Sequence, residues 1–199
     1  MNKKKVGIFG GTFNPPHIGH VASAKCFLQQ MELDELLIVP TFIPPHKAYE
    51  SSVSCDERLT MCKLAFVDIP NVVVSDMEIK RGGASYTYLT LKELSNENTE
   101  LYFLCGTDMI LSMGEWKNPD VIFALAKICY IRRENDNSND LLIKQKCEEY
   151  RKKYQAELFQ INASAIEISS SEIRSEDADM ESFLPKAVYD YIKEMELYK

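Results

Sequence analysis

Two histidines three positions apart, His17 and His20, follow a glycine pair and a diproline near the start of the chain. The glycines, Gly10 and Gly11, come directly after an apolar run, so the segment predicts a strand, a glycine turn and a helix start. A helix that opens on such a turn offers main-chain N–H groups and a positive dipole end to phosphate. Because residues 17 and 20 of that helix share one face, both imidazoles can address one phosphate chain. The pattern predicts a nucleoside-triphosphate site, with capping or core histidines as the alternative.

A second anion-binding pattern lies far along the chain, where three serines precede Glu172 and Arg174. Ser169 and Glu172 have the spacing of a capping box, which gathers hydroxyls and free amides at a helix start. Arg174 adds a permanent cation. Alone, the segment is more typical of an ordinary capped helix with a surface arginine than of an anion site. Beside the histidine segment, we interpret it as part of the same phosphate site.

Other chemistries lack their patterns in this sequence. The glycines form neither a Gly-x-Gly-x-x-Gly fingerprint nor a P-loop, which would end in Gly-Lys-Ser/Thr. Histidine and cysteine never fall at zinc-ligand spacing, and no Gly-x-Ser-x-Gly nucleophile elbow is present. Phosphate binding is therefore the chemistry that the motifs favour.

These two segments resemble the two halves of a known signature. Residues 10–20 are similar to the His-x-Gly-His motif of a nucleotidyltransferase superfamily, in the form found in bacterial nicotinate-nucleotide adenylyltransferases. Residues 168–174, Ile-Ser-Ser-Ser-Glu-Ile-Arg, resemble its second half. Pro44-Pro45-His46-Lys47, Ser85-Tyr86-Thr87, Gly106-Thr107-Asp108 and Trp116 also match, so the resemblance spans nearly the whole chain. Asn14 departs from it, because many members carry Asp there, but an amide keeps the hydrogen-bonding capacity.

The resemblance implies a set of site residues. His17, His20 and Arg174 would be catalytic, as donors to the phosphates. ATP would be bound by Gly10, Gly11, Thr12, Phe13, His17, His20, Gly106, Asp108, Ile168, Ser170, Ser171 and Arg174. Nicotinate mononucleotide would be bound by His46, Lys47, Ser85, Tyr86, Thr87 and Trp116. Mg²⁺ would accompany ATP, with Asp108 as its protein ligand.

Several of these residues have ordinary structural alternatives. A helix start at 85–87 can hold a carboxylate, and Trp116 can stack on a cationic pyridinium ring, but a lone tryptophan is also a common core residue. His46 and Lys47, stiffened by two prolines, would meet the mononucleotide phosphate unless Lys47 is a solvated loop lysine. Asp108 can bind Mg²⁺ or ribose hydroxyls and can also cap a helix.

The expected reaction is transfer of AMP from ATP to nicotinate mononucleotide, giving nicotinate adenine dinucleotide and pyrophosphate. The attacking phosphate is already an anion, so alignment and charge stabilisation suffice without a general base. One alternative is a related adenylyl- or cytidylyltransferase acting on nicotinamide mononucleotide or phosphopantetheine. Another is a module that binds ATP without turnover.

Periodicity predicts the elements that position these residues. Strands are expected over 6–9, 36–39, 72–74 with extension toward 79, 101–105, 128–131 and 158–161. Helices are expected over 21–31 with Val21, Ala24, Leu28 and Met31 inward, after Ser54, over 86–94, from 118, over 141–154 and over 185–195, with a polar loop at 134–140. Continuous apolar strands between helices predict an α/β, Rossmann-like, doubly wound and mostly parallel sheet with helices on both faces. Ligands of such sheets bind beyond the carboxyl ends of the strands.

Composition limits the class of protein. The 199 residues fit a single domain over 1–199, and the net charge of −7 argues against nucleic-acid binding. Six cysteines without a Cys-x-x-Cys pair predict free thiols. The basic start lacks a long enough apolar stretch for a signal peptide, and no run suits a membrane helix. We expect a cytoplasmic protein, and a homo-oligomer is compatible with the sequence.

Overall fold

The computed structural model describes residues 3–45, 53–131, 139–163, 168–175 and 179–198. These residues form one six-stranded sheet in the order β3-β2-β1-β4-β5-β6, with every neighbouring pair parallel. The strands are β1 Lys4–Gly11, β2 Glu35–Pro40, β3 Val72–Val74, β4 Thr99–Gly106, β5 Ala126–Ile131 and β6 Leu158–Ile161. The fold is therefore the doubly wound Rossmann-like sheet that the sequence predicts.

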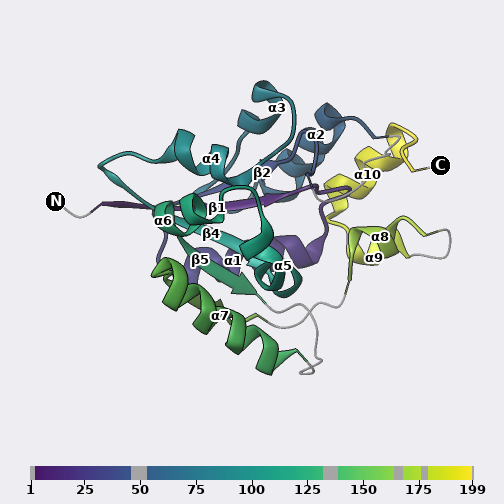
Figure 1. The fold of residues 1–199 in the computed structure, drawn as a ribbon. Helices are drawn as coiled ribbons and strands as arrows, with labels where there is room; N and C mark the ends of the chain where they lie inside the picture. The colour runs from purple at the N-terminus through teal and green to yellow at the C-terminus, as the bar shows by residue number, and fades with distance from the viewer. Residues whose placement is uncertain (1–2, 46–52, 132–138, 164–167, 176–178, 199) are drawn as a thin grey trace.

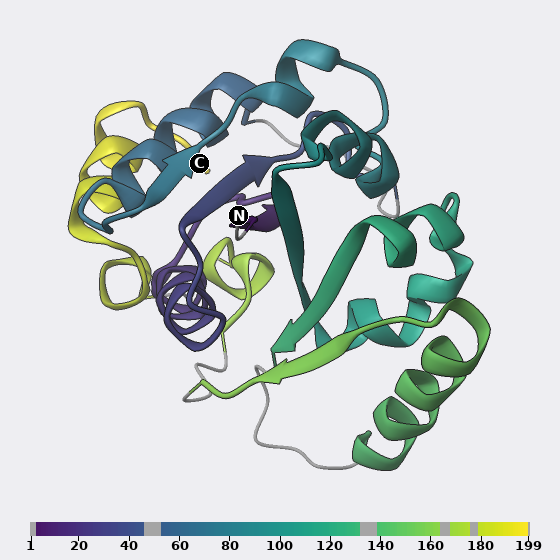
Figure 2. The same cartoon turned by 90° about the vertical axis from the view of Figure 1, so that its left-hand side faces the viewer.

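Helices cover both faces of this sheet (Figures 1 and 2). One face carries α1 Ile18–Gln30 and α2 Cys55–Phe66; the other carries α4 Thr87–Leu94, α5 Thr107–Ser112, α6 Pro119–Leu125 and α7 Asp140–Tyr154. The alternation of β4 shows why both faces are apolar: Leu101 and Phe103 pack toward α4–α7, while Tyr102 and Leu104 pack toward α1 and α2. Each face therefore buries its own core.

Gly7 in β1 lets α1 lie close to the sheet. A Cβ on this residue would come within 2.4 Å of the Leu33 side chain and 3.0 Å of the Phe27 ring. The space above β1 is thus filled by the Phe27 side chain of α1 and by the Leu33 side chain, which comes just after this helix. This close approach fixes the height of the helix whose first turn carries the histidines.

A third layer lies outside α2 and brings the C-terminal segment back toward β1. It consists of α8 Ser170–Ile173, α9 Met180–Phe183 and α10 Lys186–Glu194. Buried Ile173, Val188 and Ile192 share a core with Met61 of α2. This packing holds α8 beside the carboxyl end of the sheet.

The strand order changes direction between β1 and β4, which are neighbours although β2 and β3 intervene in sequence. Gly11 ends β1 and Gly106 ends β4 at the same edge of the sheet. At such a switch point the chain leaves the two strands in opposite directions, which opens a crevice suited to ligands. Gly10, Gly11, Gly106 and Asp108, which the resemblance assigns to ATP, lie at or just beyond these two strand ends.

Most expected elements are confirmed, and the differences lie in short helices. Residues beyond Val74 do not extend β3, because α3 Met77–Arg81 follows instead and ends at Gly82, whose φ is +68°. Three short helices were not predicted, because so few residues show no apolar periodicity: α3, α9 and the 3₁₀ helix η1 at Met113–Glu115. The short helix α5 was considered only as the alternative in which Asp108 caps a helix. Most of the predicted polar loop at 134–140 lies outside the described residues, and Asp140 begins α7.

The buried face of α1 differs from the predicted one. The buried residues are His20, Ser23, Ala24 and Phe27, whereas Val21, Leu28 and Met31 are only partly buried. The helix is rotated because its first turn must pack His20 against the end of β1. In the described part of the chain, no helix is long and apolar enough to cross a membrane.

Candidate active site

The rings of the two histidines lie close together at the start of α1, tilted by 41° to each other. His17 is the N-cap residue and His20 the third residue of the helix, with ring centroids 3.7 Å apart. The main-chain N–H of His17 donates to Nδ1 of His20 at 3.2 Å. Because Nδ1 accepts this bond, the proton of the His20 imidazole lies on Nε2. His20 is thereby prepared to donate a hydrogen bond from Nε2.

The turn before the histidines is built on Phe13 rather than on glycine. Gly10 and Gly11 are the last residues of β1, and Phe13 takes the left-handed backbone conformation with φ +48°. That conformation costs a non-glycine residue about 1 kcal/mol. The Phe13 ring is buried and lies 5.0 Å from the His20 ring between centroids. The expected glycine turn is therefore wrong in detail, and the packing of a phenylalanine fixes the backbone.

Gly11 has a packing function in this turn. A Cβ at this position would meet the Phe13 ring at 3.2 Å, closer than most side-chain contacts allow. The missing side chain thus leaves room for Phe13 to fold back over the end of β1. The Phe9 ring, 5.4 Å from that of Phe13, completes an edge-to-face contact beneath it.

The start of α8 docks directly on the turn that precedes the histidines. The Ser170 hydroxyl donates to the Pro15 carbonyl at 2.9 Å. Nη1 of Arg174 donates to the Asn14 carbonyl and, at 3.0 Å, to the Ser170 carbonyl. Nη2 of the same guanidinium donates to the Ser171 hydroxyl at 3.3 Å. The two halves of the predicted signature, 155 residues apart in sequence, therefore meet in space.

The predicted capping box at α8 is present. The Ser169 hydroxyl accepts from the Glu172 N–H at 3.2 Å, and the Glu172 carboxylate accepts from the Ser169 N–H at 2.6 Å. Hydrogen bonds from Ser169 lower the pKa of the exposed Glu172 carboxyl, with a smaller contribution from His17. Ile168, just before this cap, is partly buried against the C-terminal core.

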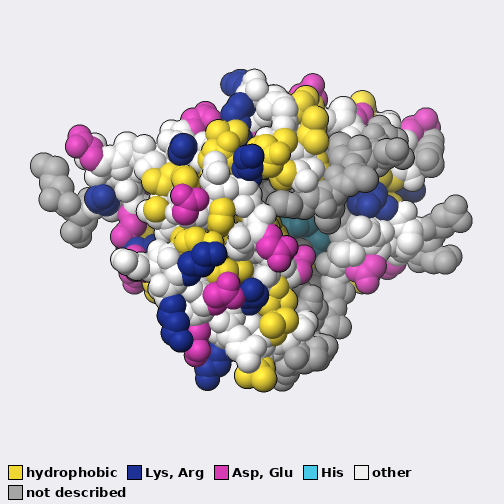
Figure 3. Space-filling view, viewed as in Figure 1, with side chains coloured by type: hydrophobic (Ala, Val, Ile, Leu, Met, Phe, Trp, Pro, Cys, Tyr) yellow, Lys and Arg dark blue, Asp and Glu magenta, His cyan; other side chains and the backbone are white. Residues whose placement is uncertain are grey.

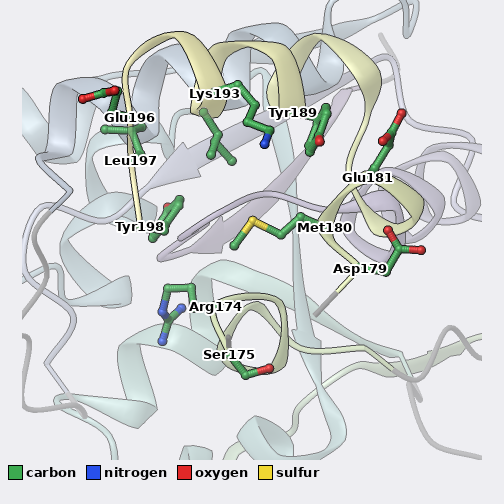
Figure 4. A pocket seen from close by; sticks show the side chains of 11 residues that line it. Arg174, Ser175, Asp179, Met180, Glu181, Tyr189, Lys193, Glu196, Leu197 and Tyr198 are labelled. Atoms are coloured by element: carbon green, nitrogen blue, oxygen red, sulfur yellow. The ribbon is translucent and has the colours of Figure 1, made fainter. Parts of the chain in front are cut away.

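Tyr198 contacts Asn14, the position at which the sequence departs from the signature. Its hydroxyl donates to Oδ1 of Asn14 at 2.5 Å. Beside this contact, a pocket opens between α8 and α10, with Arg174 on one side and Tyr198 and Lys193 on the other (Figure 4). Sequence reasoning missed Tyr198, because one aromatic residue after a terminal helix carries no signal of its own.

Gly106, Thr107 and Asp108 lie at the carboxyl end of β4. Gly106 is the N-cap of α5, so the alternative in which Asp108 caps a helix is wrong. Asp108 lies in the first turn, is exposed, and stands so close over Gly106 that a Cβ there would be 2.8 Å from Oδ1. Among the described residues, no group of three His, Cys, Asp or Glu side chains could hold a metal ion. Asp108 can supply one carboxylate, which suits a Mg²⁺ held mainly by phosphates and water.

The residues predicted for the second substrate are less clearly arranged around a site. Ser85 is buried, and its hydroxyl accepts from the Phe42 N–H at 2.9 Å. Tyr86 is the N-cap of α4, and Thr87 is its first residue. The Trp116 side chain is 9% exposed and donates from Nε1 to the Ser112 hydroxyl at 3.3 Å. His46 and Lys47 lie outside the described residues.

In the space-filling view, histidine side chains lie at the bottom of a hollow at the carboxyl edge of the sheet (Figure 3). Consistent with this view, His17 is 1% and His20 7% exposed. Sequence reasoning also missed Arg58, a fully buried cation of α2 that binds the backbone beside this hollow. Its only sequence signal was a charge within the apolar side of a predicted helix.

Fold and site together define the class of protein. The sequence profile described as cytidylyltransferase-like matches residues 8–176, so the chain belongs to this family of nucleotidyltransferases. Two full-length relatives carry the name "Probable nicotinate-nucleotide adenylyltransferase": one from Listeria innocua is 34% identical over 198 residues, and one from Clostridium perfringens 37% over 201 residues. Each comparison covers 98% of both chains. Within the family, the chain belongs to the nicotinate-nucleotide adenylyltransferases.

A solved structure has the same fold. Nicotinic acid mononucleotide adenylyltransferase of Plasmodium falciparum, complexed with NaAD, superposes with a TM-score of 0.76 at 20% identity. The superposition covers 98% of this chain and 97% of that one. At 20% identity this similarity shows that the two proteins share the fold, and it extends over the whole sheet and its helices.

Proposed function

We propose that this chain transfers the adenylyl group of ATP to the phosphate of nicotinate mononucleotide, releasing pyrophosphate. The observation that carries the proposal is the direct contact between the α1 turn and α8, through Ser170 and Pro15 at 2.9 Å. It brings the turn that precedes the histidine pair together with the helix start that carries Arg174. These are the groups that a triphosphate needs, and the full-length relatives bear the name of this activity.

The α1 turn would hold the ATP phosphates near the reacting phosphorus. His20 would donate from Nε2, because Nδ1 is occupied by the His17 N–H. Such a donor stabilises the charge that develops as pyrophosphate leaves. His17, whose ring lies 3.7 Å from that of His20 between centroids, would provide the second imidazole. Gly10 and Gly11 would let the nucleotide lie against the end of β1.

The α8 start would hold the outer phosphates. The Ser170 and Ser171 hydroxyls and Arg174 lie on one short segment docked on the histidine turn. Arg174 already donates to carbonyl oxygens, so its guanidinium is oriented before ATP binds. Mg²⁺, carried on the phosphates, would neutralise part of their charge, with Asp108 as the carboxylate within the site.

The acceptor would bind near the start of α4. The main-chain N–H of Thr87, the first residue of α4, would receive the nicotinate carboxylate at the helix N-terminus, because the Tyr86 N–H already donates to the Ala84 carbonyl at 2.9 Å. Trp116 precedes α6, which packs against α4, so its ring belongs to the same side of the sheet. Stacking on the pyridinium would require the buried indole to present one face to the ligand.

The test is a coupled pyrophosphate-release assay with ATP, Mg²⁺ and one acceptor at a time. We expect the largest kcat/KM with nicotinate mononucleotide, and a dinucleotide product of the corresponding mass. Nicotinamide mononucleotide and phosphopantetheine serve as matched competitors. A larger kcat/KM with either of them would reassign the acceptor, and ATP binding without pyrophosphate release from any acceptor would overturn the proposal.

A further inference from the structure

Arg58 is a fully buried arginine in α2 that no part of the predicted signature includes. Its guanidinium reaches two separate loops. Nη1 donates to the Thr12 carbonyl at 2.8 Å, and Nη2 donates to the Thr41 carbonyl at 2.7 Å and to the Phe42 carbonyl at 3.4 Å. One side chain thereby joins the turn after β1 to the loop after β2.

The bond to Thr12 fixes the direction of the next amide. The peptide unit between Thr12 and Phe13 is planar and trans, so its N–H and C=O point in opposite directions. With the carbonyl held by Arg58, the Phe13 N–H points away from α2. Within the described part of the chain, this N–H donates to no protein acceptor. It is a main-chain donor oriented at the carboxyl end of β1.

The second loop shows the same geometry with its acceptor in place. Arg58 holds the Thr41 carbonyl, and the N–H of the same peptide unit, that of Phe42, donates to the Ser85 hydroxyl at 2.9 Å. The Ser85 N–H in turn donates to the Ile43 carbonyl at 2.9 Å. Arg58 and Ser85 therefore hold this loop by hydrogen bonds to the two ends of one peptide unit. The segment before α4, proposed to meet the acceptor, is linked through it to the nucleotide turn.

We propose that Arg58 is a positioning residue that holds the Phe13 N–H toward the ATP phosphates and couples the nucleotide turn to the acceptor side. The inference rests on the proposed adenylyl transfer. Phe13 has a left-handed backbone, so its amide would leave this orientation without an external constraint. An arginine suits the task, because its planar fork reaches two carbonyl groups at once while a lysine ammonium is a single point.

The test compares Arg58→Lys and Arg58→Met with Arg151→Lys. Arg151 is the control, since its guanidinium also donates to main-chain oxygen, at the single carbonyl of Leu158, but it is exposed and lies on the opposite face of the sheet. Hydrogen exchange is measured first, without substrate, on peptides covering 11–16 and 40–45. We expect hydrogen exchange in both segments to be at least tenfold faster in the Arg58 variants than in the wild type. The exchange rate of β6 should not change. Unchanged exchange in a folded Arg58 variant would overturn the proposal.

Kinetics provide the second readout. We expect Arg58→Lys to raise KM for ATP and to lower kcat/KM by about a hundredfold in total, as a misplacement near 1 Å does. A loss of folded protein alone would reduce the apparent kcat and leave KM unchanged. The wild type is assayed with all three acceptors beforehand, so failure of the proposed function is seen separately from failure of the Arg58 proposal.

A wild-type measurement keeps the proposal testable if neither Arg58 variant folds. In ¹⁵N-labelled protein, saturation with ATP and Mg²⁺ should shift the Phe13 amide proton strongly downfield and protect it from exchange. The Phe42 amide, already bonded to Ser85, should move little. A Phe13 amide that does not respond at saturating ATP would contradict the proposed orientation.

Discussion

The proposed nucleotide side and the proposed acceptor side of this site are organised differently. On the nucleotide side, packing of the Phe13 ring holds the turn from Thr12 to His17. Hydrogen bonds from Arg58 and from the start of α8 to the backbone of the turn hold it as well. On the acceptor side, the Ser85 hydroxyl and the Trp116 N–H already have protein partners. The first region presents oriented donors, whereas the second is built largely from structural contacts.

This difference follows from what each substrate offers. A triphosphate is a flexible polyanion, so its alignment must come from rigid protein donors. A pyridine ring is itself rigid and needs a flat surface and one carboxylate site. Changes on the nucleotide side should therefore affect turnover, and changes on the acceptor side should affect selectivity and stability.

The largest expected effect is that of His20→Ala. Loss of a donor to the developing charge typically costs about 3 kcal/mol, or about a hundredfold in kcat. We expect KM for nicotinate mononucleotide to change by less than about threefold, because the histidine acts on ATP. Steady-state kinetics with each substrate varied in turn measure both values, and near-normal turnover would remove the histidine pair from the mechanism.

Arg174→Ala tests the other half of the nucleotide side. Removing the guanidinium takes away a cation and its bonds to the Asn14 and Ser170 carbonyls, so we expect KM for ATP to rise about tenfold. Arg174→Lys should recover only part of this loss, because it keeps the charge without the fork. An unchanged KM for ATP in Arg174→Ala would leave α8 with a purely structural role. Arg151→Ala serves as the control.

Trp116→Phe separates stacking from core packing on the acceptor side. If the indole stacks on the pyridinium, the smaller ring should raise KM for the acceptor about fivefold and leave KM for ATP unchanged. If Trp116 is only a core residue packed edge-on against Phe103, the free energy of unfolding should fall by about 1 kcal/mol with both KM values unchanged. Kinetics and urea unfolding of the same variant distinguish the two outcomes.

Glu78→Gln has the smallest expected effect, and this effect is on the free energy of unfolding. Glu78 is 5% exposed; burial raises its pKa, although hydrogen bonds from Thr90 and Ser85 and the charge of Arg81 oppose the shift. An acid whose pKa is raised in the folded state stabilises the fold below its unfolded pKa and loses that contribution as pH rises through the folded pKa. The variant should thus be more stable than wild type near pH 7, on the order of 1 kcal/mol.

The pH dependence gives the control for Glu78→Gln. Below about pH 4, Glu78 is protonated in both folded and unfolded chains and resembles glutamine, so the advantage of the variant should vanish. Urea unfolding at a series of pH values measures the difference. An advantage that persisted at low pH would come from packing rather than from charge burial.

The sequence predicted contiguous features well and isolated contacts poorly. All six strands, the capping boxes at Ser54 and Ser169 and the family were confirmed, because each depends on residues adjacent in the chain. The meeting of residues 14–15 with α8 could be inferred only because both halves of one signature were present. Arg58 and Tyr198 were missed, since their partners are carbonyl or amide groups set by tertiary packing. The roles predicted for the site residues stay predictions.

The distance in sequence between Pro15 and Ser170 has a consequence for folding. A growing chain on the ribosome that has not yet produced β6 would contain both histidines and still lack the helix that docks on them. Contacts between residues so far apart form late, because the loop that they close is entropically expensive. Nucleotide affinity should therefore appear only near the end of folding, which makes ATP retention a sensitive indicator that refolding of this protein is complete.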